Sequence, residues 1–130
     1  MKWSKDYATG IERIDEDHKT IFRMSEDFRA ALDEGMGGAV YAVLLDSLHM
    51  YCRGHFGYEE RCMHEHRCPV AQKNKDAHAA FLKTMTSFQQ RYTENGFDTV
   101  DARRLVDTID AWLSNHICRI DIHLKKCVSK

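Results

Sequence analysis

The chain has little proline, no long apolar run and almost no net charge. Its 130 residues include one proline, Pro69, so long helices can run uninterrupted, because proline breaks helix interiors. No run of about 18 apolar residues occurs, and we therefore expect no transmembrane helix. The 19 Lys and Arg against 20 Asp and Glu leave a net charge of −1. A chain with almost no net charge is not strongly attracted to nucleic acid or to an anionic membrane, so neither is expected as a partner.

The cysteines and the N-terminus indicate a reducing compartment. An odd number of irregularly spaced cysteines does not fit a secreted disulfide framework: Cys52, Cys62, Cys68, Cys118 and Cys127. The first ten residues, MKWSKDYATG, hold no apolar stretch of the kind that a secretory signal needs. We expect a cytoplasmic protein. The length is that of one domain, spanning residues 1–130.

Apolar residues recur every three or four positions in four long segments. These segments cover about residues 15–33, 39–64, 70–93 and 98–124. Val40, Val43 and Val100 are counted among the apolar positions. No segment alternates with the period of a strand. The pattern predicts an all-α fold, an up-down-up-down four-helix bundle, preceded by an irregular N-terminal arm whose Trp3 and Tyr7 pack on the bundle.

Several positions in phase with the predicted core carry polar side chains. They are His18, His55, Glu59, Asn74, His78, His116 and, close by, Asp121. Each buried polar group without a partner costs about 1–3 kcal/mol, and one domain cannot bear many of them. Any one histidine alone is more often structural than functional. A shared metal ion would satisfy all of them, and bundle cores commonly hold such sites.

The spacing of these residues supports a metal site. His55 and Glu59 are four apart and share a helix face, as Asn74 and His78 do. His116 and Asp121 are five apart, about 140° on an ideal helix, so Asp121 would need a π-type bulge or a longer reach. Two carboxylates among several imidazoles suit a pair of iron ions.

Four motifs together resemble the hemerythrin family, specifically the bacterial hemerythrins. They are residues 10–18 (GIERIDEDH), residues 55–60 (HFGYEE) with Met63, Pro69 followed by residues 78–81 (HAAF), and residues 112–117 (WLSNHI) followed by Asp121. The resemblance covers nearly the whole chain. It implies a four-helix bundle that holds two non-haem iron ions, bridged by an oxo or hydroxo group, and binds dioxygen.

The resemblance also implies a role for each matching residue. Glu59 and Asp121 would bridge the two irons. His18 and His55 would bind the iron with fewer histidines, whereas His78 and His116 would bind the other. The expected function is that of an oxygen carrier, store or sensor rather than an enzyme.

Asn74 departs from the family pattern, which places a histidine there. An amide oxygen is a weaker iron ligand than imidazole. Asn74 therefore coordinates through its oxygen, yields its place to water, or leaves that iron loosely held. An opened position would favour an alternative function, a redox enzyme or sensor that handles peroxide or nitric oxide.

Two further features each have a functional and a structural interpretation, and two other histidines are expected at the surface. Two thiols and two imidazoles alternate at Cys62, His64, His66 and Cys68, which form either a zinc or copper site or a solvated helix end. Gly54 and Gly57 flank His55 and indicate either space near the metal or a close approach to this helix, or else simple tolerance on its outer face. His49 and His123 are expected to face solvent.

Overall fold

A computed structural model of the chain describes residues 3–128. Four long helices account for most of this range: α1 (Glu12–Asp33), α2 (Gly37–Glu65), α3 (Ala71–Asn95) and α4 (Thr99–Arg119). Short helical segments flank them: η1 (Lys5–Tyr7), η2 (Asp121–His123) and α5 (Leu124–Val128). No β-strand occurs between residues 3 and 128.

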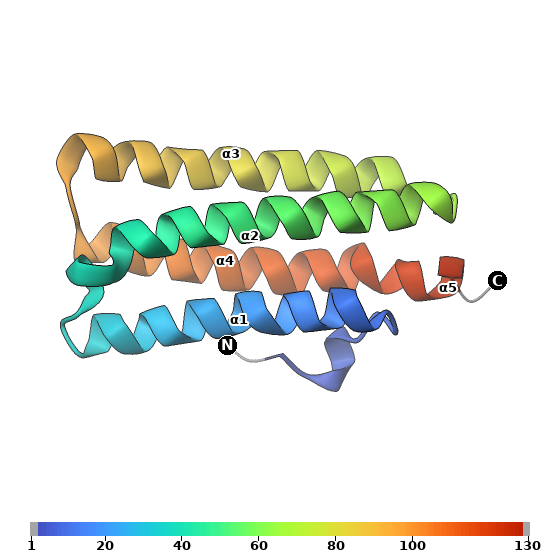
Figure 1. Cartoon of the computed structure of the whole chain (residues 1–130), viewed down its shortest axis with the longest axis horizontal. Coiled ribbons are helices and arrows are strands. Elements are labelled where there is room, and N and C mark those ends of the chain that lie inside the picture. The colour runs from blue at the N-terminus through green and yellow to red at the C-terminus, as the bar shows by residue number, and fades with distance from the viewer. Residues whose placement is uncertain (1–2, 129–130) are drawn as a thin grey trace.

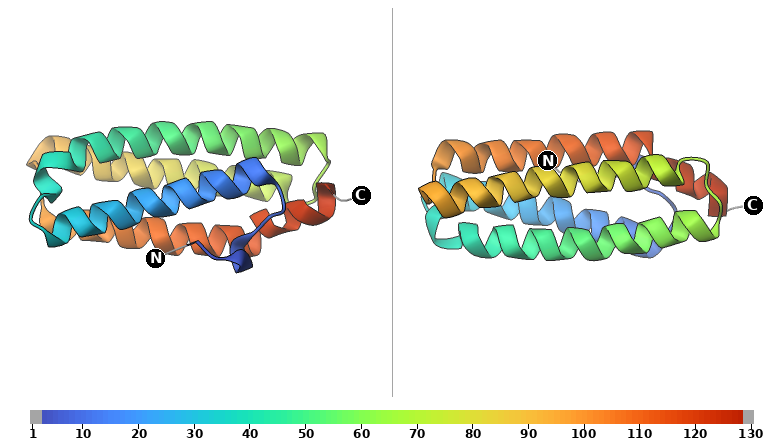
Figure 2. Two further views of the ribbon diagram at one scale, coloured as in Figure 1. Left: turned by 60° about the horizontal axis from the view of Figure 1, so that its bottom comes forward. Right: turned by 90° about the horizontal axis from the view of Figure 1, so that it is seen from above.

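The four long helices form an up-down-up-down bundle (Figures 1 and 2). Consecutive helices are antiparallel, α1 packs against α2 and α4, and α3 packs against α2 and α4. The all-α bundle predicted from periodicity is confirmed. Within the described part of the chain, no helix has the length and apolarity needed to cross a membrane.

Glycine and an N-cap set the turns at one end of the bundle. Gly35 and Gly96 both have φ +77°, in the left-handed region that only glycine adopts without strain. After the second of these turns, the Asp98 carboxylate accepts a hydrogen bond from the backbone N–H of Asp101 at 3.2 Å. This cap satisfies one of the free N–H groups that begin α4.

The N-terminal arm is fixed to α1 by a carboxylate. Asp15 Oδ1 accepts hydrogen bonds from the Thr9 backbone N–H and hydroxyl, both at 2.8 Å. Tyr7 packs on Phe22 with ring centroids 5.6 Å apart, and the Lys19 ammonium lies 4.5 Å from the Trp3 ring centroid. Trp3 and Tyr7 therefore contact the bundle as expected.

The fourth helix ends earlier than its apolar pattern predicts. It stops at Arg119, because Ile120 leaves helical geometry (φ −121°, ψ −61°) and η2 begins at Asp121. The break turns the Asp121 side chain inward without the π-type bulge considered for an unbroken helix. The expected extension of this helix to residue 124 is therefore wrong.

The buried apolar residues form two clusters on either side of a polar layer. The larger cluster includes Phe22, Phe56 and Ile117, and the smaller one includes Ile14 and Met63.

Three valines that were counted among the periodic apolar positions lie outside the core. Val40, Val43 and Val100 are 38%, 68% and 65% exposed. They follow a three-to-four spacing that lies on the solvent side of their helices, and spacing alone does not identify which side faces the core.

Candidate metal centre

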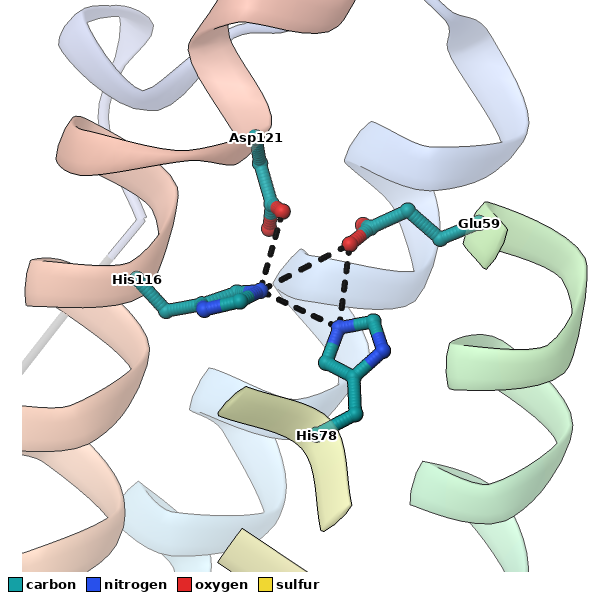
Figure 3. Close-up of side chains that lie close together, drawn as sticks. All are labelled: Glu59, His78, His116 and Asp121. Atoms are coloured by element: carbon teal, nitrogen blue, oxygen red, sulfur yellow. Dashed lines mark hydrogen bonds and ion pairs between the residues drawn. The ribbon is translucent and has the colours of Figure 1, made fainter. Parts of the chain in front are cut away.

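The polar residues in core phase converge on one buried layer of the bundle. All seven are 5% exposed or less: His18, His55, Glu59, Asn74, His78, His116 and Asp121. They come from all four long helices and from η2. Figure 3 shows four of them pointing toward one another, Glu59 from α2, His78 from α3, and His116 and Asp121 from the end of α4 and η2.

One group of side chains joins α1 and α2. His18, His55 and Glu59 each place a ligand atom within 4.8 Å of the others. Glu59 Oε2 lies 3.5 Å from His18 Nε2 and 3.3 Å from His55 Nε2. These three side chains could hold one metal ion.

A second group joins α2, α3, α4 and η2. Glu59, His78, His116 and Asp121 also place ligand atoms within 4.8 Å of one another. Glu59 Oε1 lies 3.1 Å from His78 Nε2 and 3.7 Å from His116 Nε2. Figure 3 shows these contacts as dashed lines. This group could hold a second ion.

Each of the two carboxylates faces both groups. Glu59 turns Oε2 to His18 and His55, and Oε1 to His78 and His116. Asp121 places Oδ2 3.2 Å from His18 Nε2 and Oδ1 3.1 Å from His116 Nε2. One oxygen per side is the arrangement by which a carboxylate bridges two metal ions.

The buried atoms of this layer are poorly satisfied by one another. Both oxygens of Glu59, both oxygens of Asp121 and Nε2 of His18 lack a hydrogen bond of good geometry, although the carboxylate oxygens lie close to histidine nitrogens. Native proteins rarely leave such groups without a partner. Lone pairs directed into a common space fit metal ions, so the residues present match the donors that iron takes.

Two further carboxylates orient the histidine rings from outside. Asp17 Oδ2 lies 3.0 Å from His55 Nδ1, and Glu60 Oε2 lies 3.0 Å from His78 Nδ1. Such contacts fix the proton on Nδ1 and leave the Nε2 lone pair directed inward. Neither residue is identified as a histidine partner from the sequence. Their only signal is an acid adjacent in sequence to His18 or Glu59.

Aromatic rings hold the second pair of histidines in place. Phe56 stacks on His78 with centroids 3.9 Å apart and planes 6° apart. Trp112 stacks on His116 with centroids 4.4 Å apart. These contacts fix ring orientation and exclude water from one side of each imidazole.

The charges of the layer shift its pKa values in opposite directions. Burial lowers the pKa of His18 and of His116, but the carboxylates of Asp121 and Glu59 outweigh it and raise both pKa values to about 9. Burial raises the pKa of Glu59, yet the four surrounding histidines bring it well below its usual value. Without metal, this layer holds protons that metal ions would displace.

Asn74 points its amide into the same layer. Its oxygen lies 2.7 Å from His116 Nε2, and its nitrogen is buried without a hydrogen-bond partner. The side chain is therefore long enough to bring an oxygen to the position where His116 would meet a metal. Its donor is one neutral oxygen, whereas a histidine would supply an imidazole nitrogen.

The alternating thiols and imidazoles near the end of α2 do not converge. Helix α2 continues through Glu65, His64 and His66 are exposed, and Cys68 is buried in the smaller apolar cluster. Among residues 3–128, the close groups of metal-binding side chains are the two described above. His123 is exposed as expected, whereas His49 is half-buried rather than solvent-facing.

The fold and this layer define a class, an all-α bundle whose core holds a histidine–carboxylate cluster suited to metal. Residues 9–128 match the family model described as the hemerythrin HHE cation binding domain. Bacteriohemerythrins from Stenotrophomonas maltophilia and Pseudomonas aeruginosa are each 30% identical over 117 residues, which is 90% of this chain and 74% of the relative. A bacteriohemerythrin from Clostridium acetobutylicum is 23% identical over 122 residues, 92% of this chain and 94% of the relative.

The chain belongs to the hemerythrin family and is a non-haem iron-binding domain. The family binds a di-iron centre, and the buried cluster is suited to one. The resemblance read from the four motifs is thereby confirmed, as is the di-iron cofactor.

Proposed function

We propose that this protein binds dioxygen reversibly at a di-iron centre in the bundle core. The proposed ligands are His18, His55, Glu59, His78, His116 and Asp121, with the Asn74 oxygen as a further ligand beside His116. The observation that supports this most is the orientation of Glu59 and Asp121. Each carboxylate points one oxygen to the first histidine group and the other oxygen to the second. When bound, a pair of ferrous ions supplies the two electrons that hold dioxygen.

The chain's own residues provide the setting for that chemistry. Asp17 and Glu60 hold the Nδ1 protons of His55 and His78, so both rings present Nε2 to the centre. Buried apolar residues close the layer above and below, including Ile14, Met63 and Ile117, all 0% exposed. These residues exclude water, and with it a source of protons, from the layer.

The test is an optical titration of the reduced, iron-loaded protein with dioxygen. We expect a new absorption band that saturates at about one dioxygen per chain and disappears on evacuation. An irreversible change on first exposure, with no recovery under vacuum, would reject reversible binding.

A second candidate function depends on Asn74. Its single neutral oxygen lies where the family pattern has an imidazole, and as a weaker ligand it would give way more easily to another molecule. The alternative proposal is therefore a redox enzyme or a sensor for peroxide or nitric oxide. Asn74→His should lengthen the lifetime of the dioxygen-bound form and slow peroxide turnover. If neither quantity changes, Asn74 does not set the function.

The proposal also covers the extent of the domain, its role and its location. We propose that residues 1–130 form one such domain, acting as an oxygen carrier, store or sensor. A cytoplasmic location suits its cysteines, none of which forms a disulfide in the described part of the chain.

A further inference from the structure

The solvent side of α2 carries an unusual set of residues. Opposite the core lie Val43, Ser47, Met50, Gly54 and Gly57, spaced alternately by four and three positions; we call these the α2 outer face. Val43 is 68% exposed and Met50 is 75% exposed. A solvent-facing helix surface is ordinarily charged. Figure 2 shows α2 along an edge of the bundle.

The two glycines of this face have no explanation within the chain. A glycine in the interior of a helix costs about 0.5–1 kcal/mol relative to alanine. A Cβ built at Gly54 would meet no atom within 4 Å, and one at Gly57 would meet only the Arg61 guanidinium at 3.6 Å. Neither glycine makes room for a neighbouring helix of its own chain or for the metal layer. Glycine does, however, permit another backbone to approach this side closely.

A groove lies beside the outer face, between α1 and α2. Its volume is about 350 Å³, and its lining includes Met24, Phe28, Leu44 and Ser47. The lining is mainly apolar, so the groove suits an apolar side chain. Val43 and Ser47 belong both to this lining and to the α2 outer face, so the groove extends the apolar surface of that face.

We propose that two copies of this chain associate through the α2 outer face, with their α2 helices antiparallel about a twofold axis between residues 48 and 49. In this register, Val43 of one copy lies opposite Gly54 of the second copy. Ser47 lies opposite Met50 of the second copy, so a small side chain faces a large one. Because of the twofold axis, each of these pairs of a large and a small residue occurs twice in the interface.

The charges at the edge of the face fit the same arrangement. Asp46 and Arg53 are both exposed and lie on the side of α2 that faces α3, where Asp46 Oδ1 accepts a hydrogen bond from Gln89 Nε2 at 2.9 Å. The twofold axis brings these edges together. Asp46 then lies within two residues, about 3 Å along the helix, of Arg53 of the second copy. The face is complementary to itself in both size and charge, which favours a second copy over an unrelated protein.

Sedimentation of the iron-loaded full chain over a range of concentrations tests the proposal. We expect a monomer–dimer equilibrium, and Val43→Lys should raise its Kd by about 100-fold, because the charge is introduced twice. Val100→Lys is the matched control, since Val100 is 65% exposed but lies on α4 away from the face. A wild-type chain that remains monomeric at millimolar concentration would overturn the proposal. A dimer that both variants weaken equally, or that neither weakens, would overturn it as well.

A second variant separates association from folding. Gly54→Ala should raise the thermal stability of the monomer, because alanine favours the helix and meets no atom of the chain. The added methyl group should at the same time raise the dimer Kd about tenfold by separating the helices. Exchanging the charges in Asp46→Arg with Arg53→Asp should restore what either single change weakens. An unchanged Kd for Gly54→Ala would contradict the close approach of the two helices.

Discussion

At the scale of single residues, Glu59 has the most demanding position. It is fully buried, and its two oxygens face four imidazoles, one from each long helix. We expect Glu59→Gln to reduce the iron content from about two ions per chain to one or fewer, because a neutral amide cannot bridge two cations. Metal analysis after expression with excess iron measures this.

The matched control for Glu59 is Glu65→Gln, on the exposed last turn of the same helix. It should retain the full iron content. Equal iron in wild type and Glu59→Gln would mean that this carboxylate is not a shared ligand.

The carboxylates behind the histidines are expected to act through ring orientation. Asp17→Asn and Glu60→Gln each weaken the hold on an Nδ1 proton, so each should lower iron affinity by about 10–100-fold. Competition with a chelator measures the affinity. Asp27→Asn, exposed on α1, serves as the control. If Asp17→Asn and the control release iron at the same chelator concentration, the positioning role of Asp17 is wrong.

The candidate ligands were predictable from the sequence, but their outer partners were not. His18, Glu59 and His78 stand out because polar residues in core phase need a partner. Asp17 and Glu60 do not stand out, because acids next to other acids are ordinary on a helix surface. Their role depends on the rotation of a neighbouring helix, which periodicity does not give.

At the scale of elements, the four long helices follow from their three-to-four spacing and from the glycine turns. Two features did not. The break at Ile120 is a local backbone choice that brings Asp121 inward, and no breaker residue marks it. Val43 fits the helical period as well as a core residue does, although it lies on the opposite side.

A polar link between α1 and α4 was also not predictable from the sequence. Buried Asp110 accepts hydrogen bonds from the Ser25 hydroxyl at 2.8 Å and from Arg29 Nη2 at 2.9 Å. We expect Asp110→Ala to lower the free energy of unfolding by about 1–3 kcal/mol, because Ser25 and Arg29 lose their acceptor. Iron content should not change. Urea unfolding measures the loss.

For this link, Asp107→Ala is the comparison, since Asp107 binds the same arginine from a largely exposed position. It should cost well under 1 kcal/mol. A loss of iron in Asp110→Ala would show that the link also supports the metal layer.

At the scale of the whole molecule, metal and protons compete for the same buried layer. In the metal-free protein, the carboxylates of Asp121 and Glu59 outweigh the opposing effect of burial and raise the pKa values of His18 and His116 from 6.5 to about 9. The stability that these pairs contribute is complete below pH 6.5 and is lost as the pH rises through 9. We therefore expect the metal-free protein to melt at a lower temperature at pH 9 than at pH 6.5, as followed by circular dichroism.

Iron should remove this dependence, because bound ions displace the protons on His18 and His116. The iron-loaded protein is expected to melt at nearly the same temperature across that range, and above the metal-free protein. If the melting temperatures of the metal-free and iron-loaded forms fell equally between pH 6.5 and pH 9, metal and protons would not compete for this layer.

Mössbauer spectroscopy of the oxidised protein, loaded with ⁵⁷Fe, shows whether Glu59 and Asp121 join two iron ions. If Glu59 and Asp121 bridge two ions, the spectrum will show two ferric ions per chain in a magnetically coupled, diamagnetic ground state. Uncoupled high-spin ferric ions, or a single iron per chain, would contradict the account.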